Sequence, residues 1–180
     1  MKKVLLLVVF AGVFAGCSSI SVRRDYDTSA DFSGLKKFAW QYAEQPETGD
    51  PRIDNDLIDA RIRRAVDETL EAKGFQSSDA ANADFLVVYF VEYKRRLNSG
   101  SISFGLGGGR AGRHGGVGYD TGVSEYDQAS LTIDMIDPVG KKMIWRGVGD
   151  RSAYDGSSPE KMTKIINASV AKILKGFPPE

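Results

Sequence analysis

The stretch Asp84-Phe85-Leu86-Val87-Val88-Tyr89-Phe90-Val91-Glu92-Tyr93 decides the fold of this chain. It is apolar on both alternating faces for most of its length, a pattern typical of a strand that is covered on both sides or central in its sheet. Other candidate elements precede and follow it in the sequence. We therefore expect residues 84–93 to form the core strand around which those elements pack.

Shorter strands are predicted on both sides of this segment. Residues 131–136 and 142–148 flank Asp137-Pro138-Val139-Gly140. The Pro and Gly positions of that tetrapeptide suit a type I turn, so this region predicts a hairpin. Residues 20–26 alternate like a strand, and residues 35–40 predict another short one.

Two amphipathic helices are predicted from apolar residues at helical spacing. The first starts at the capping residues Asp54-Asn55-Asp56 and ends at Lys73-Gly74, and the second starts at Ser157 or Ser158 and ends at Gly176. Both end in Lys-Gly-Phe, which predicts a left-handed glycine followed by a phenylalanine that folds back on the last turn. The apolar stripes comprise Ile58, Ile62, Ala65, Val66, Thr69 and Leu70 in the first helix, and Met162, Ile165, Ile166, Ser169, Val170, Ile173 and Leu174 in the second.

The order of these elements predicts the fold class. Strands, helix, strand, hairpin and helix fit an α+β fold, a two-layer domain in which two amphipathic helices pack against a largely antiparallel sheet. A length of 180 residues with 42% hydrophobic and 27% charged residues suits one globular domain. The 24 basic and 24 acidic side chains balance, which disfavours binding to nucleic acid because no basic excess is left to neutralise phosphates.

The N-terminus has the order of a secretory signal. Lys2 and Lys3 precede 12 apolar residues from Val4 to Ala15, too few to span a bilayer as a helix. The single Cys of the chain, Cys17, follows Ala15-Gly16 and matches the lipobox of bacterial lipoproteins. We therefore expect cleavage between Gly16 and Cys17 and acylation of the Cys17 thiol.

This pattern divides the chain into a signal peptide (1–16), a lipidated N-terminus that serves as tether or first strand (17–25), and a single α+β domain (26–180). A diacylglycerol and an N-acyl chain on Cys17 are expected to hold the protein to the membrane, since two or more chains make anchoring stable. No other cofactor is expected. Processing removes Lys2 and Lys3 and leaves 22 basic against 24 acidic side chains, so anchoring requires no basic patch. Ser18 after the Cys favours the outer membrane, facing the periplasm.

Several short motifs together resemble a family of bacterial envelope lipoproteins described as a domain of unknown function. The resemblance extends over almost the whole mature chain, and it implies an α/β lipoprotein fold in the cell envelope but no reaction and no catalytic residue. The motifs are the lipobox, Asp31-Phe32-Ser33, Phe38-Ala39-Trp40, Ala83-Asp84-Phe85-Leu86-Val87, a glycine-rich insert, Ile144-Trp145-Arg146-Gly147 and Phe177-Pro178-Pro179.

The glycine-rich insert, residues 100–118, is the most unusual segment and has no Asp or Glu. Gly107 to Gly112 formally match the dinucleotide pattern G-x-G-x-x-G, but no strand leads into them and no helix follows, so nucleotide binding is disfavoured. A connector between two strands is the simpler interpretation. The alternative is contact of Arg110, Arg113 and His114 with acidic lipid headgroups or with carboxylates of a partner.

Catalysis finds little support, and we predict that the protein is not an enzyme. His114 is the only His and lies in the glycine-rich insert, so the sequence offers neither an ordered general base nor a His-Cys metal cluster. Two further sets of residues suit a cation site and an aromatic groove. Turn and surface roles are favoured for the acidic set, and core roles for the aromatic set. The acidic set is Asp134, Asp137, Asp150 and Asp155, and the aromatic set is Trp40, Tyr89, Tyr93 and Trp145.

Two classes of function remain. The first is an envelope structural or protein-interaction module that contacts another envelope protein or polymer, and the alternative is a module that binds a small ligand or lipid. An interaction module predicts a filled core and an exposed apolar or edge-strand surface. A ligand-binding module predicts an apolar cavity between helices and sheet. The pattern leaves the oligomeric state open.

Overall fold

A computed structural model describes residues 20–98, 124–152 and 158–179. The predicted signal peptide, Cys17 and the glycine-rich insert lie outside these ranges. The elements are β1 (Ser21–Tyr26), β2 (Lys37–Trp40), α1 (Asp56–Ala72), β3 (Gln76–Ser77), β4 (Phe85–Asn98), β5 (Ser124–Ile136), β6 (Met143–Ser152) and α2 (Pro159–Leu174).

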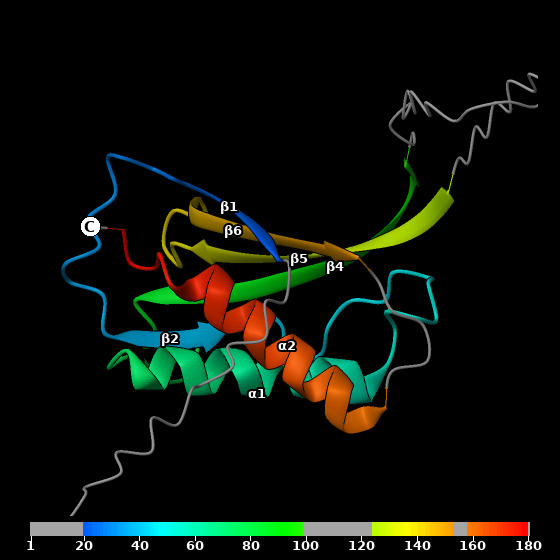
Figure 1. Cartoon of the computed structure of the whole chain (residues 1–180). Coiled ribbons are helices and arrows are strands. Elements are labelled where there is room, and N and C mark those ends of the chain that lie inside the picture. The colour runs from blue at the N-terminus through cyan, green and yellow to red at the C-terminus, as the bar shows by residue number, and fades with distance from the viewer. Residues whose placement is uncertain (1–19, 99–123, 153–157, 180) are drawn as a thin grey trace, which may run out of the picture.

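The six strands form one sheet in the order β1-β6-β5-β4-β2-β3. The pairs formed by β1 with β6, β6 with β5, and β5 with β4 are antiparallel, whereas β2 pairs in parallel with β4 and β3. Both helices lie on one face of the sheet, as Figure 1 shows. The predicted α+β fold with a largely antiparallel sheet is therefore confirmed, and the predicted hairpin is β5–β6.

β4 occupies the interior position that its sequence predicted, between β5 and β2. Of the two environments proposed for it, the central position is correct, and the face opposite the helices is partly covered, with Val88 buried. Phe85 and Val87 face the helices and are fully buried, whereas Phe90 on the opposite face is 48% exposed. β4 and β5 are long because they pair over thirteen successive positions, from Leu86 with Ile136 to Asn98 with Ser124.

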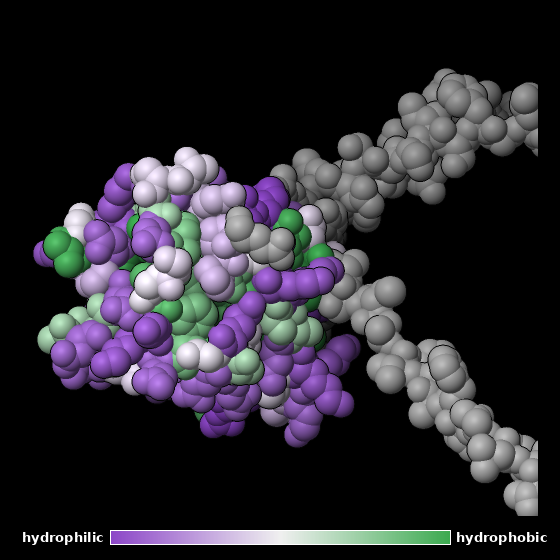
Figure 2. Space-filling view, turned by 90° about the vertical axis from the view of Figure 1, so that its left-hand side faces the viewer, coloured by the Kyte–Doolittle hydropathy of each residue, from purple (hydrophilic) through white to green (hydrophobic). Residues whose placement is uncertain are grey.

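The core lies between the helices and the sheet and is richest in aromatic rings around Phe177. That ring has centroid distances of 5.2 Å to Phe85, 5.3 Å to Trp145 and 5.5 Å to Phe75. Phe177 is fully buried, so the segment after α2 closes this end of the core. Figure 2 faces this end, and hydrophobic residues are visible between the mostly hydrophilic surfaces of the two layers.

Glycines in β6 set the close approach of α2 to the sheet. A Cβ atom built on Gly147 would lie 2.5 Å from the Trp145 ring and 2.6 Å from Ile173, and one on Gly149 would lie 2.8 Å from Ile173. No side chain fits between strand and helix at these positions. Ile173 can therefore pack directly on the backbone of β6.

The two helices start as predicted but end differently. The Asn55 and Ser158 side chains cap α1 and α2. Gly74 is left-handed, with φ at 93°, and the amide of Phe75 donates to the Leu70 carbonyl, as in a Schellman motif. The matching prediction for Gly176 is wrong, because that glycine has no positive φ.

Arg24 explains the different end of α2. Its guanidinium donates to the carbonyl oxygens of Ile173 at 3.0 Å and Lys172 at 2.5 Å. These bonds satisfy the last carbonyls of α2 from outside the helix, so no left-handed residue is needed. Gly176 is required instead for space, because a Cβ atom there would lie 2.6 Å from Arg24 Cδ.

Candidate functional site

An apolar cleft opens between the helices and the sheet at the end away from Phe177. Its volume is about 80 Å³. Small residues of the sheet, such as Ala129 and Gly149, leave the space unfilled, and Ile58, Val91 and Met162 around it are only half buried. The remaining lining residues are Ile62, Tyr93, Ser130, Leu131, Arg151, Ile165, Ile166 and Ser169.

The mouth of this cleft is charged on the side of the loop between β2 and α1. The Arg52 guanidinium carbon lies 4.6 Å from the centre of the Tyr93 ring. Arg52 also pairs with Asp50 at 2.7 Å and with Asp127 on β5 at 3.4 Å. The loop is thereby held against the end of the cleft by a cation–π contact and by ion pairs.

A polar network joins α1 to β2 and β4 beside the cleft. Asp59 accepts from the Tyr89 hydroxyl at 2.8 Å and pairs with Arg63 at 2.8 Å, while Asp67 accepts from the Trp40 indole at 3.0 Å. Burial, with a further contribution from Asp59, raises the pKa of the Tyr89 hydroxyl, which therefore stays neutral. Burial also raises the pKa of Asp67 above its ordinary value, although the Trp40 hydrogen bond opposes the shift. The network therefore ties α1 to the sheet through polar side chains.

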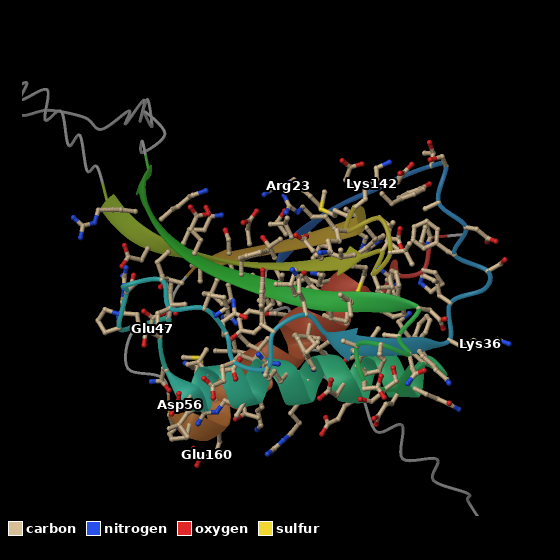
Figure 3. All side chains as sticks on the ribbon, turned by 180° about the vertical axis from the view of Figure 1, so that it is seen from behind. Arg23, Lys36, Glu47, Asp56, Lys142 and Glu160 are labelled. Atoms are coloured by element: carbon tan, nitrogen blue, oxygen red, sulfur yellow. The ribbon has the colours of Figure 1, made fainter. Side chains whose placement is uncertain are left out.

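An acid-lined hollow of about 440 Å³ lies between the β2–α1 loop and the start of α1. Figure 3 labels Glu47 and Asp56 at this end of the molecule. Two of its carboxylates accept hydrogen bonds: Asp54 accepts from the amides of Thr48 and Gly49, and Asp59 accepts from the Tyr89 hydroxyl. Within the described ranges, no group of three or more His, Cys, Asp or Glu residues is arranged to hold a metal ion.

The face of the sheet opposite the helices carries ion pairs across neighbouring strands. Asp134 is 3% exposed and makes two bonds with the Arg146 guanidinium, at 2.7 and 2.6 Å. Asp150 accepts from Ser130 at 2.5 Å and pairs with Arg23 at 2.6 Å. Although burial acts to raise it, the pKa of Asp150 is lowered because Ser130 and Arg23 outweigh that effect. Figure 3 shows Arg23 on the side of the sheet away from the helices.

The predicted acidic set is not brought together by the fold. Asp134 and Asp150 each bind a different arginine, and Asp137 accepts from the amides of Val139 and Gly140 within the β5–β6 turn. Asp155 lies outside the described residues. The turn role that the sequence favoured therefore applies to Asp137, whereas Asp134 and Asp150 are buried in ion pairs and do not have the surface roles expected of them.

The aromatic set also divides. Trp145 and Tyr89 are buried in the core, and Trp40 packs edge-on against Tyr89 with a centroid distance of 6.2 Å. Only Tyr93 lines the cleft. The lipidation and cleavage positions Cys17 and Gly16, and the proposed contact residues Arg110, Arg113 and His114, lie outside the described residues.

Sequence analysis did not identify the cleft. Most of its lining residues had been assigned to the apolar stripes or to strands, where periodicity marks them as inward-facing but does not say whether the space between them is filled. The one local signal is the run of small residues Ala129-Ser130, next to Leu131, whose partner on the neighbouring strand is Gly149. That pairing becomes visible only when the register of β5 with β6 is known.

Comparison with known proteins identifies a family to which this chain is similar over most of its length. Residues 22–179 match the family described as Domain of unknown function (DUF4136). A search of curated proteins found no match. In the described part of the chain, neither helix is long and apolar enough to cross a membrane.

Two solved structures illustrate the similarity. A PDZ domain protein from Parabacteroides distasonis shares 15% identity at a TM-score of 0.56 over 89% of this chain, which spans only 36% of that protein. PelC from Paraburkholderia phytofirmans, solved as a dodecamer, shares 18% identity at a TM-score of 0.46, covering 86% of this chain and 94% of that one. At these identities the similarity concerns the fold alone.

Proposed function

The chain belongs to the DUF4136 family, a domain of unknown function, and from that premise we propose that it is a lipid-anchored protein-interaction module of the bacterial cell envelope. The anchor is a diacylglycerol with an N-acyl chain on Cys17, in the outer membrane and facing the periplasm. The partner is another envelope protein, one of whose apolar side chains enters the cleft between the helices and the sheet. The role is non-enzymatic.

The size of the cleft carries this proposal. At about 80 Å³ it is roughly half of the ~150 Å³ engineered cavity that holds one benzene ring. It is also well below the ~300–1,000 Å³ of sites for small molecules. A single aliphatic side chain suits the available space, and such anchors in small pockets commonly dominate protein–protein binding. The position of the cleft, between helices and sheet, is the one expected of a ligand-binding module, but its small size favours an interaction module.

The exposure of the lining residues points the same way. Ile58, Val91, Leu131 and Met162 pack against the core but stay partly accessible. Apolar surface that is left partly open in a cleft favours association, because covering it removes that surface from water. The Arg52, Asp50 and Asp127 cluster beside the mouth supplies the polar rim expected of such an interface.

Site-specific photo-crosslinking in intact membranes tests the cleft. A photoreactive phenylalanine analogue at Met162, which lines the cleft, should yield one protein adduct, identified by mass spectrometry. The same analogue at Leu57, which is 64% exposed and outside the cleft, serves as the control. In the Met162 background, Ala129→Leu fills the cleft and should reduce the adduct at least tenfold. Ala72→Leu, at an exposed position at the end of α1 and outside the cleft, should leave it unchanged.

Two outcomes would contradict the cleft as the docking site. Adducts with lipid or small molecules only would favour the alternative, a ligand-binding module. A protein adduct that persists in Ala129→Leu would place the contact elsewhere. Thermal unfolding of Ala129→Leu checks that the variant stays folded, since overpacking costs about 1–3 kcal/mol.

The anchor is tested in the same membranes. Cys17→Ser should abolish incorporation of labelled fatty acid and release the protein from the membrane pellet, while the thermal unfolding midpoint of the domain stays unchanged. Continued labelling of the Ser variant would rule out acylation at this residue.

A further inference from the structure

The exposed face of α2 carries lysines near both of its ends. Lys161, Lys164, Lys172 and Lys175 are exposed, and at 3.6 residues per turn they fall within an arc of about 80°. Ala168 and Ala171 are also exposed and share this side of the helix. We call these six residues the lysine stripe. Glu160 is the only acidic residue in α2 and lies in its first turn.

Helix stability accounts for only part of the lysine stripe, since Glu160 and Lys164 form a favourable i, i+4 charge pair. Lys172 and Lys175 lie at the C-terminal end of α2, where the helix dipole favours positive charge. Lys161 and Lys164 lie in the first two turns, where the dipole disfavours it. Cations at both ends are better explained by an anionic surface that extends along the helix.

The lysine stripe lies beside the point where the described chain begins. Lys172 Nζ donates to the Ile20 carbonyl at 2.7 Å. Ile20 itself is 5% exposed, and its Cγ2 atom lies close to Gly149 of β6. Ile20, where the described chain begins, is thereby fixed against α2, next to β1 in Figure 1.

Little chain separates this fixed point from the proposed lipid. Cys17 precedes Ile20 by three residues, which span at most about 11 Å when fully extended. An acylated Cys17 would therefore hold α2 close to the bilayer surface. The lysine stripe, about 21 Å from Lys161 to Lys175, would be within reach of the headgroups along its length.

We propose that the lysine stripe binds the anionic phospholipid headgroups of the membrane that carries the anchor. This inference rests on the lipid anchor of the proposed function. The lysine ammonium groups and the lipid phosphates are complementary in charge, and the helix orients the domain on the bilayer. The net charge indicates only that anchoring requires no basic patch, whereas i, i+3 and i+4 spacing gathers these lysines on one side of α2.

Vesicle binding by unlipidated protein tests the lysine stripe independently of the anchor. The protein is residues 17–180 with Cys17→Ser, which retains every described residue. The probes are phosphatidylcholine vesicles with and without 30% phosphatidylglycerol, a composition chosen for the assay, at low and high salt. Binding should require the anionic lipid and weaken at high salt, since screening acts on exposed charges.

Matched variants assign the binding to the helix. Each lysine near an anionic surface contributes about fivefold, so Lys161→Gln/Lys164→Gln/Lys175→Gln should lower the partition coefficient by about 10²-fold. Lys172 is kept because it holds Ile20. The control Lys36→Gln/Lys37→Gln/Lys141→Gln makes the same change in net charge on exposed lysines outside α2, and it should alter binding less than threefold.

Three results would overturn the inference. The first is equal binding to vesicles with and without phosphatidylglycerol. The second is an equal loss of vesicle binding in the two triple variants. The third is absence of vesicle binding together with crosslinking of the α2 lysines to an acidic protein. Failure of acylation at Cys17 would contradict the anchor but would not change the vesicle result. The two proposals can therefore fail separately. Circular dichroism of each variant confirms that the exposed substitutions leave the fold intact.

Discussion

The helices α1 and α2 cover the same face of the sheet, have nearly the same length and end in the same Lys-Gly-Phe sequence, yet they contact the sheet in different ways. α1 is tied to β2 and β4 by polar side chains, through Asp59 with Tyr89 and Asp67 with Trp40. α2 packs on glycines of β6 through Ile173 and has its last carbonyls bound by Arg24. The polar face of α1 is therefore partly used within the fold, whereas the lysines of α2 stay exposed, although Lys172 also holds Ile20.

Their charges differ accordingly. With its C-cap Lys73, α1 carries five acidic and four basic residues, a balance of −1, while α2 with its C-cap Lys175 carries four lysines and one glutamate, a balance of +3. The near-neutral total of the chain conceals this separation. Two amphipathic helices of similar length therefore differ in role: α1 makes polar contacts within the domain, and α2 presents exposed lysines at its surface.

The largest expected loss of stability comes from removing the phenylalanine that follows each helix. Phe177 after α2 is fully buried and contacts four aromatic rings, whereas Phe75 after α1 is 8% exposed and contacts two. Phe177→Ala should lower the free energy of unfolding by about 4–5 kcal/mol and Phe75→Ala by about 3 kcal/mol. Urea denaturation measures both. A larger loss for Phe75→Ala would mean that α1, not α2, closes the aromatic core.

A smaller effect separates the two uses of glycine. Gly147→Ala should cost about 2–3 kcal/mol, because its Cβ atom would clash with Trp145 and Ile173. Gly74→Ala should cost about 1 kcal/mol, from the left-handed backbone alone, since no atom lies within 4 Å of the new Cβ. Asn, which tolerates positive φ, should be accepted at Gly74 and rejected at Gly147. Equal thermal shifts for Asn at both positions would contradict this distinction.

The smallest effect concerns the polar contacts of α1. Burial raises the pKa of Asp67 above its ordinary value of 3.8, so ionisation costs stability as pH rises through the folded-state pKa. Asp67→Asn retains an oxygen that can accept from the Trp40 indole and should stabilise the protein by roughly 0.5 kcal/mol at pH 7. The gain should vanish below pH 3.8, where Asp67 is protonated in both states. Thermal unfolding at both pH values measures it, and a loss of stability at neutral pH would show that the Asp67 charge is favourable.

Most of the elements could be predicted because their signals are local. The apolar spacing of residues 56–72 and 159–174, the caps Asn55 and Ser158, and the turn at Asp137-Pro138-Val139-Gly140 depend on neighbours within a few residues. β3, with two residues, was missed because it exists only by pairing in parallel with β2. The Gly176 prediction failed because Arg24, about 150 residues away, binds the helix end.

The candidate sites follow the same division. The lysines of α2 are local in sequence, and their spacing was available to a helical projection, but their closeness to Ile20 was not. The cleft depends on the register of three strands and on how α1 and α2 cross them. No local pattern contains that information, since periodicity identifies an inward face but not the volume opposite it.

Local sequence signals predict both helices and where they begin, every strand but β3 at least in part, and the interior position of β4, because backbone hydrogen bonding, capping and apolar periodicity act over short separations. The strand order, the end of α2, the unfilled cleft and the position of the lysine stripe beside Ile20 become known only from the tertiary structure. Each of these depends on contacts between residues far apart in sequence, and such contacts form only when packing brings the elements together.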